Sequence, residues 1–306
     1  MNDRQAPSYL LIVNPVSGRG GGRTRARALS DALSRHFQVE VAETRGRGDA
    51  VDIAGTRGME FGRVIAVGGD GTLNEVLTGL WRSGRPPDAL PELGFLPSGT
   101  ANAAAPAFGL RREPTEVAQA LVGAPSRPVD FGVVRSSEGE RPFLLWCGAG
   151  YDAVVIDALN SSRTGRMGIL GLVRNTPGVV RRIAAYRESP VEAEVDGARW
   201  PELGGVVVAN VADIAFGGTI AAGADPFDGS LDVVAVPVGA KARLPLFGMA
   251  MLSSGLQAVR GARFARATTV GLRAPGPVPV QIDGEPAGHL PIDVRVVAGG
   301  VRLLLT

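Results

Sequence analysis

The sequence predicts two domains: an N-terminal doubly wound α/β domain and a C-terminal antiparallel β-sandwich domain with helical inserts. Apolar strand-like runs alternate with helix-like patterns up to about residue 125, which is typical of a parallel sheet covered by helices. From Phe131 onward, short β-rich runs are separated by Gly and Pro, which is typical of a sandwich. A length of 306 residues favours two domains. We place them at residues 1–127 and 128–297, and residues 298–306 either close the sandwich or join the first domain.

Each strand expected in the first domain is a short apolar run that leads into a loop and then a helix. These strands are expected at residues 9–13, 39–41, 64–67 and 93–96. Helices are expected at residues 23–36, 49–58, 73–81 and 115–121, with an Ala-rich helix after residue 102. Ligands bind such sheets beyond the carboxyl ends of the strands, so the loops at these ends should converge.

The second domain should consist of short strands broken by Gly-rich and Pro-rich turns. Strands are expected at residues 131–134, 143–147, 191–195, 205–211, 231–237, 268–272, 278–282, 294–297 and 301–304. Helical inserts are expected near residues 163–187 and 244–260.

Composition excludes several protein classes. The formal net charge of +2 gives no electrostatic reason to expect nucleic acid. The single cysteine, Cys147, excludes an internal disulfide framework and fits a reducing compartment. Neither a signal peptide nor a membrane-spanning apolar run is recognisable. We therefore expect a cytoplasmic protein, with peripheral attachment to the inner membrane face as an option, and the sequence leaves open whether the chain forms a homodimer.

The loop Gly68-Gly69-Asp70-Gly71-Thr72 follows a strand that reads as buried and opens a helix. Glycines let a backbone approach a ligand closely, and the free N–H groups of a helix N-terminus suit phosphate. Asp70 would repel phosphate unless a divalent cation lies between them or the carboxylate tunes a charge network. The loop therefore indicates a nucleotide-phosphate site that uses metal. The alternative is a tight turn in which Asp70 is only a cap.

Two more loops have a similar character. Asn14-Pro15-Val16-Ser17-Gly18 follows the first strand, and Pro97-Ser98-Gly99-Thr100-Ala101-Asn102 follows the fourth. Asn14 and Ser17 can hydrogen-bond an anion, and the glycines permit close approach. The first loop lacks the Gly-Lys-Ser/Thr ending of a P-loop, so that motif is excluded. A flexible loop between strand and helix is the alternative.

These loops and the later Asp283-Gly284-Glu285, in this order, resemble the diacylglycerol kinase catalytic-domain family, which includes bacterial lipid kinases and sphingosine kinases. NAD kinases share the Gly-Gly-Asp-Gly-Thr turn, but the other motifs favour the lipid branch. The resemblance implies ATP- and Mg²⁺-dependent transfer of a phosphate to the hydroxyl of a diacylglycerol-like or sphingoid lipid. The residues implied to hold the nucleotide are Asn14, Ser17, Gly18, Thr44, Gly68, Gly69, Asp70, Gly71, Thr72, Asn74, Ser98, Gly99, Thr100 and Asn102.

The same resemblance implies that Glu285 is the general base that accepts the proton of the attacking alcohol, with Asp283 supporting it or binding metal. The alternative is an Asp-Gly hairpin turn with an exposed Glu. A second acidic loop, residues 225–232, is implied to hold a structural Mg²⁺ through the side chain of Asp228 and main-chain oxygens of Asp225 and Ser230. A solvated turn is the alternative there.

Two segments, residues 160–187 and 233–282, contain basic residues and no Asp or Glu. Each basic residue near an anionic membrane contributes roughly 1 kcal/mol, so we expect peripheral membrane contact that brings a lipid to the second domain. Solvated Arg-rich surfaces are the alternative, and nucleic acid is not expected because aromatic residues for base stacking are few. The basic residues are Arg163, Arg166, Arg174, Arg181, Arg182 and Arg187, then Lys241, Arg243, Arg260, Arg263, Arg266 and Arg273.

Two rival functions stay open on the sequence alone. A soluble kinase similar to NAD kinases would phosphorylate a polar alcohol. A regulatory module would bind nucleotide without turnover. The second rival is motivated by Ala103, because many members of the family that the chain resembles carry Asp there, and an Arg near the position of Pro106.

Overall fold

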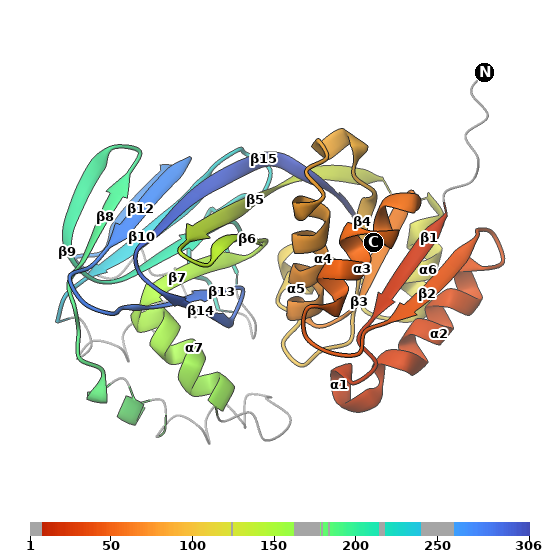
Figure 1. Ribbon diagram of the computed structural model, residues 1–306, viewed down its shortest axis with the longest axis horizontal. Coiled ribbons are helices and arrows are strands. Elements are labelled where there is room, and N and C mark those ends of the chain that lie inside the picture. Colours follow the sequence, from red (N-terminus) through yellow and green to blue (C-terminus); the bar gives the residue numbers. More distant parts are fainter. Residues whose placement is uncertain are drawn as a thin grey trace. The chain divides into compact units, whose positions relative to one another are not determined.

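The strands of the α/β unit form a parallel sheet in the order β4-β3-β1-β2 (Figure 1). We describe a computed structural model, which covers residues 8–123, 125–161, 178, 180–182, 184–213, 218–239 and 260–306. This first unit comprises Met1–Val129 and Gly299–Thr306, and the second comprises Asp130–Ala298. The strands of the first unit are β1 (Tyr9–Val13), β2 (Val39–Glu43), β3 (Arg63–Gly68) and β4 (Glu92–Pro97).

The end of the chain adds to this sheet. Strand β15 (Ile292–Leu304) carries Leu303, which pairs in parallel register with Leu93 of β4. Residues of β1 are buried along its whole length, as expected for a parallel strand covered on both faces. The carboxyl ends of β1, β3 and β4 therefore lie side by side at one edge of the sheet.

Helices surround this sheet. Helices α2 and α6 contribute Leu29, Leu33 and Leu121 to a core that also contains Leu11 of β1 and Ile65 of β3. Helix α4 packs against β3 and against α3. The helices of this unit are α1 (Ser17–Gly20), α2 (Gly22–Leu33), α3 (Asp49–Gly55), η1 (Arg57–Glu60), α4 (Asp70–Arg82), η2 (Pro87–Ala89), α5 (Ala104–Ala107) and α6 (Pro114–Gly123).

The second unit is built on antiparallel pairs, as the sandwich prediction requires. Its strands follow the order β14-β13-β7-β9-β8-β12-β15, while β10 joins β9 to β11 and β5 joins β15 to β6. The strands are β5 (Ser126–Ser136), β6 (Gly139–Phe143), β7 (Trp146–Gly150), β8 (Val191–Val195), β9 (Ala198–Ala209), β10 (Leu231–Pro237), β11 (Arg263–Ala267), β12 (Thr269–Arg273), β13 (Pro279–Ile282) and β14 (Glu285–His289).

Several elements of the second unit differ from the expectation: β6 was not expected, and β15 is one strand where two were expected, at 294–297 and 301–304. Helix α7 (Tyr151–Ser161) packs against β7, β13 and β14 and was not expected (Figure 1). Strands β11 and β14 were also not expected, because β11 has no β-branched residue and β14 contains Pro and Gly, which are depleted in strands. The expected helical inserts at 163–187 and 244–260 lie mostly outside the described residues. Among the helices in the described part of the chain, none has the length and apolar character needed to cross a membrane.

Candidate functional site

The loops after β1, β3 and β4 interlock through hydrogen bonds. The amide of Asn14 donates to the hydroxyl of Thr72 at 3.4 Å, and the hydroxyls of Ser17 and Ser98 lie 2.7 Å apart. The N–H of Ser98 donates to the carbonyl of Gly68 at 2.7 Å. Residues that are far apart in the sequence thus form one constellation at the carboxyl edge of the sheet.

Glycines at this edge are required by contacts between the loops themselves. A Cβ on Gly99 would lie 2.5 Å from the Cα of Gly69, and one on Gly18, whose φ is +56°, would lie 2.2 Å from the carbonyl oxygen of Ser98. A Cβ on Gly68 would lie 2.3 Å from the hydroxyl oxygen of Thr72. Gly71 is different, because a Cβ there would have open space around it.

The carboxylate of Asp70 caps the N-terminal end of helix α5. One carboxylate oxygen accepts the N–H of Ala103 at 3.0 Å and the other accepts the N–H of Ala104, also at 3.0 Å. Burial raises the pKa of Asp70, and these backbone hydrogen bonds act in the opposite direction. The carboxylate therefore joins the first residue of α4 to the start of α5.

Other implied residues of this edge have identifiable partners. Asn102 closes its own loop, because its amide donates to the carbonyl of Gly99 at 2.8 Å and accepts the N–H of Gly99 at 2.9 Å. The N–H of Thr44 donates to the carbonyl of Val13 at 2.8 Å. Asn74 is buried, whereas Thr100 is exposed.

The edge as a whole suits an anion. Helix α4 is 13 residues long and begins at Asp70, where the loops meet. The N-terminal end of such a helix carries a partial positive charge and free N–H groups. Exposed Thr100 and the open space beside Gly71 lie in the same loops. This arrangement can bind phosphate groups.

The turn between β13 and β14 holds Asp283-Gly284-Glu285. Asp283 is 8% exposed, and its carboxylate accepts N–H groups from Leu144 at 2.9 Å, Leu145 at 2.9 Å and Trp146 at 3.1 Å. These bonds hold the segment between β6 and β7, within the stretch 143–147 that was expected as a single strand. They favour a positioning role for Asp283 over metal binding.

Glu285 is the first residue of β14 and pairs with Ile282 of β13. It is half-buried, so part of the residue reaches solvent. The preceding Asp283 has φ +47° and Gly284 has φ +81°, which form the tight turn. The hairpin turn considered as the alternative for this motif is therefore present, and Glu285 stands at its end.

Sequence reasoning missed two residues beneath this turn, Asp152 and Gln281. The Gln281 amide donates to the Asp152 carboxylate at 2.6 Å and accepts the N–H of Gly284 at 2.8 Å. Burial raises the pKa of Asp152 to about 6, although the hydrogen bond from Gln281 opposes this shift. The signal available in the sequence was a Gln in the middle of an otherwise apolar strand.

The acidic loop at 225–232 forms ion pairs with Arg266 of the neighbouring strand β11. The Arg266 guanidinium lies 3.3 Å from the carboxylate of Asp228 and 3.8 Å from that of Asp232, and donates to the carbonyl of Gly223 at 3.2 Å. Burial raises the pKa of Asp232 to about 6, Arg266 opposes the shift, and Asp228 and Asp225 add to it.

The groups proposed to hold a structural Mg²⁺ in this loop already have partners within the protein. The main-chain oxygen of Asp225 accepts the N–H of Asp228 at 3.4 Å, and the side chain of Asp228 accepts the N–H of Ser230 at 3.0 Å. Within the described ranges, no three His, Cys, Asp or Glu side chains converge to hold a metal ion. The residues present fit an arginine–carboxylate cluster better than a divalent cation.

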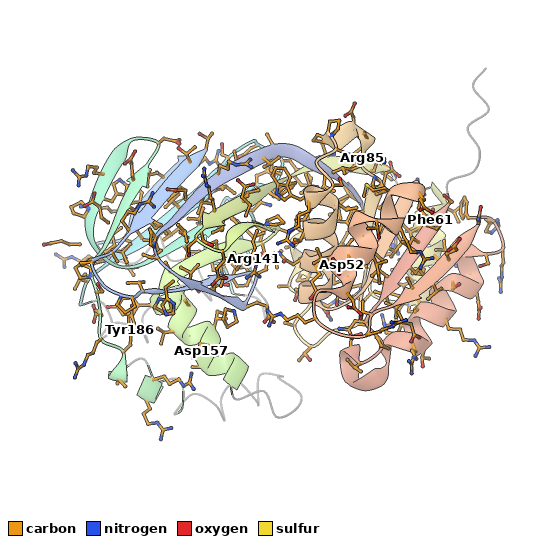
Figure 2. The ribbon with its side chains drawn as sticks, viewed as in Figure 1. Asp52, Phe61, Arg85, Arg141, Asp157 and Tyr186 are labelled. Carbon is orange, nitrogen blue, oxygen red and sulfur yellow. The ribbon has the colours of Figure 1, made fainter. Side chains whose placement is uncertain are left out.

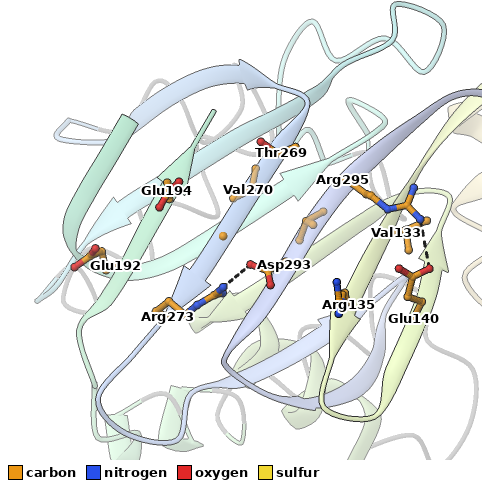
Figure 3. Close-up of a pocket in the computed structure, with 12 residues that line it drawn as sticks. Val133, Arg135, Glu140, Glu192, Glu194, Thr269, Val270, Arg273, Asp293 and Arg295 are labelled. Atoms are coloured by element: carbon orange, nitrogen blue, oxygen red, sulfur yellow. Dashed lines mark hydrogen bonds and ion pairs between the residues drawn. The ribbon is translucent and has the colours of Figure 1, made fainter. Parts of the chain in front are cut away.

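A cavity of about 430 Å³ lies over β5, β8, β12 and β15 (Figure 3). Its lining is charged, with one ion pair between Arg273 and Asp293 at 2.5 Å and another between Arg295 and Glu140 at 3.4 Å. A charged lining does not suit an acyl chain. The cavity contains none of the predicted site residues.

The Arg-rich segments are only partly described. Arg182 forms an ion pair with Asp157, which lies on helix α7 (Figure 2), so this charge is compensated within the chain, as are those of Arg266 and Arg273. Arg181, Arg187 and Arg263 are exposed. Arg163, Arg166, Arg174, Lys241 and Arg243 lie outside the described residues.

Two family models match the chain. Residues 8–134 match the family model described as the diacylglycerol kinase catalytic domain, and residues 146–305 match the YegS C-terminal NAD kinase beta sandwich-like domain. The chain is 27% identical over 309 residues to a diacylglycerol kinase of Mycobacterium tuberculosis (strain CDC 1551 / Oshkosh), covering 96% of this chain and 93% of that one.

A second relative is named probable lipid kinase YegS-like, from Stenotrophomonas maltophilia (strain K279a). It is 30% identical over 317 residues, covering 98% of this chain and 96% of the relative. The fold is similar to the crystal structure of a diacylglycerol kinase from Bacillus anthracis str. Sterne, with a TM-score of 0.74 at 19% identity over 98% of this chain and 97% of that one.

Proposed function

The chain belongs to the diacylglycerol kinase family, given its two family-model matches and its YegS-like relative, and we propose that it transfers the γ-phosphate of ATP to a lipid hydroxyl. The acceptor is a diacylglycerol-like or sphingoid lipid. The observation that supports this most is the interlocking of the three loops at the start of α4. That edge offers main-chain N–H groups and hydroxyls to a polyphosphate.

The nucleotide is held at the carboxyl edge of the first sheet. The N-terminus of α4, Gly71 and the exposed Thr100 face the phosphates, while Asn14 and Ser17 lie at the neighbouring loop. Mg²⁺ bound with ATP would neutralise charge on the phosphate oxygens. Asp70 and Asn102 keep the loops together through the bonds described above.

Glu285 is the general base of this proposal. Its carboxylate accepts the proton of the lipid hydroxyl as the oxygen forms a bond to the γ-phosphorus, and the bond between that phosphorus and the β–γ bridging oxygen breaks to release ADP. Asp283 contributes by fixing the turn that presents Glu285, because its carboxylate is already used by three backbone N–H groups.

The lipid is reached at an anionic membrane surface, by peripheral attachment at the cytoplasmic face. Exposed Arg181, Arg187 and Arg263 support this part of the proposal, since each contributes roughly 1 kcal/mol near anionic lipid. Sedimentation with anionic vesicles at low salt is the test. Binding that disappears with neutral vesicles is expected, and absence of binding to anionic vesicles would contradict it.

Transfer of labelled phosphate from ATP to a panel of lipids, to NAD and to polar alcohols tests the function. Label in the organic extract is expected for at least one lipid alcohol. Label only in the aqueous phase would make the protein a soluble kinase instead. ATP binding without any transfer would favour the regulatory module that Ala103 suggested.

A further inference from the structure

A continuous hydrogen-bonded relay connects helix α7 to the turn that carries Glu285. The carboxylate of Asp152, in the first turn of α7, accepts the amide N–H of Gln281 at 2.6 Å. The amide oxygen of Gln281 accepts the main-chain N–H of Gly284 at 2.8 Å. Gly284 is the residue directly before Glu285, so the relay ends next to the proposed base.

The relay has one possible orientation. If the Gln281 amide were reversed, its NH₂ group would face the N–H of Gly284 and its oxygen would face the Asp152 carboxylate, placing like groups against each other at both ends. Gln281 is 0% exposed, so bulk solvent does not supply alternative partners. Asp152 and Gly284 therefore fix the amide together.

Gly148 of strand β7 leaves room for the Asp152 carboxylate. A Cβ on Gly148 of β7 would lie 1.8 Å from a carboxylate oxygen of Asp152. The carboxylate thus lies against the backbone of β7. Any side chain at position 148 would displace it. Asp283, in the same turn, accepts N–H groups from residues 144–146.

We propose that Gln281, oriented by Asp152, is a positioning residue that sets the placement of the Glu285 carboxylate for proton transfer. The inference rests on the proposed function, in which Glu285 is the base. A misplacement of about 1 Å can reduce catalysis by about 100-fold, so loss of the relay should lower kcat by roughly 10-fold to 100-fold. KM for ATP should stay within about twofold, because the ATP loops belong to the other unit.

Four variants test this role in the full chain. Q281L and D152A break the relay and should show the loss in kcat. D152N keeps an oxygen acceptor for the Gln281 amide and should retain kcat within about threefold of wild type. D157N is the matched control, since Asp157 lies on the same helix and pairs with Arg182, and it should match wild type in mixed micelles of lipid and detergent.

Hydrogen exchange of the Gly284 amide supplies a second readout that does not depend on activity. Faster exchange is expected in Q281L and D152A, and unchanged exchange in D152N and D157N. If wild type transfers phosphate and Q281L and D152A keep kcat within twofold, the inference is overturned. If wild type transfers no phosphate to lipid, the proposed function fails; unchanged Gly284 exchange in Q281L and D152A would then overturn the relay as well.

Discussion

Substituting Asp152 by Asn should stabilise the protein at neutral pH. Burial raises the pKa of Asp152 from the ordinary 3.8 to about 6. Because the folded state binds this proton more tightly than the unfolded state, its contribution to stability is complete below about pH 4 and is lost as pH rises through about 6. A difference of about 2 pKa units corresponds to about 3 kcal/mol, an upper limit for the penalty of ionised Asp152 at pH 7.

Urea unfolding of wild type and D152N from pH 4 to pH 8 measures this effect. The free energies of unfolding should nearly coincide at pH 4, and D152N should become more stable as pH rises, by up to about 3 kcal/mol. Asp232 titrates in the same range, but it is common to both proteins and cancels in the difference. A difference that does not change with pH, or a less stable D152N at pH 7, would refute this reasoning.

Three further outcomes are expected. D283A should lower the free energy of unfolding by at least about 3 kcal/mol in urea titrations, because three N–H groups at 144–146 lose their acceptor; a stability equal to wild type would contradict the anchoring role. G99A should destabilise by about 1–3 kcal/mol and weaken ATP binding in calorimetry, since its Cβ would lie 2.5 Å from the Cα of Gly69, whereas G71A, with open space, should fold like wild type. Removing divalent cations with EDTA should shift the melting temperature of the ATP-free protein by less than about 1 °C, because Arg266 already pairs with two carboxylates of the acidic loop, Asp228 and Asp232; a large loss restored by Mg²⁺ would show that the loop binds metal.

Much of the α/β unit could be predicted because its signals are local. A run such as 64–67 is apolar and β-branched, and the glycines after it mark where the strand ends. The reason why glycine is required at a given loop position could not be predicted in the same way. Gly99 is required by Gly69, which lies on a neighbouring loop, and only the folded sheet brings the two together.

The residues around Glu285 in the second unit show more clearly what the sequence alone cannot predict. Glu285 was recognised from its motif, yet its strand has Pro and Gly and no strand-like pattern, so pairing with β13 determines it. Asp152 and Gln281 are separated by 129 positions in the chain, and nothing local couples them. Arg266 likewise reaches the acidic loop through the pairing of β10 with β11.

The most direct test of the account replaces Glu285 by Gln and measures ATP binding and phosphate transfer in the same preparation. We predict ATP affinity within about threefold of wild type, because the loops after β1, β3 and β4 are unchanged, and transfer to lipid reduced by about 100-fold or more, the usual cost of losing a general base. Transfer that stays close to wild type in E285Q would contradict the role given to this carboxylate.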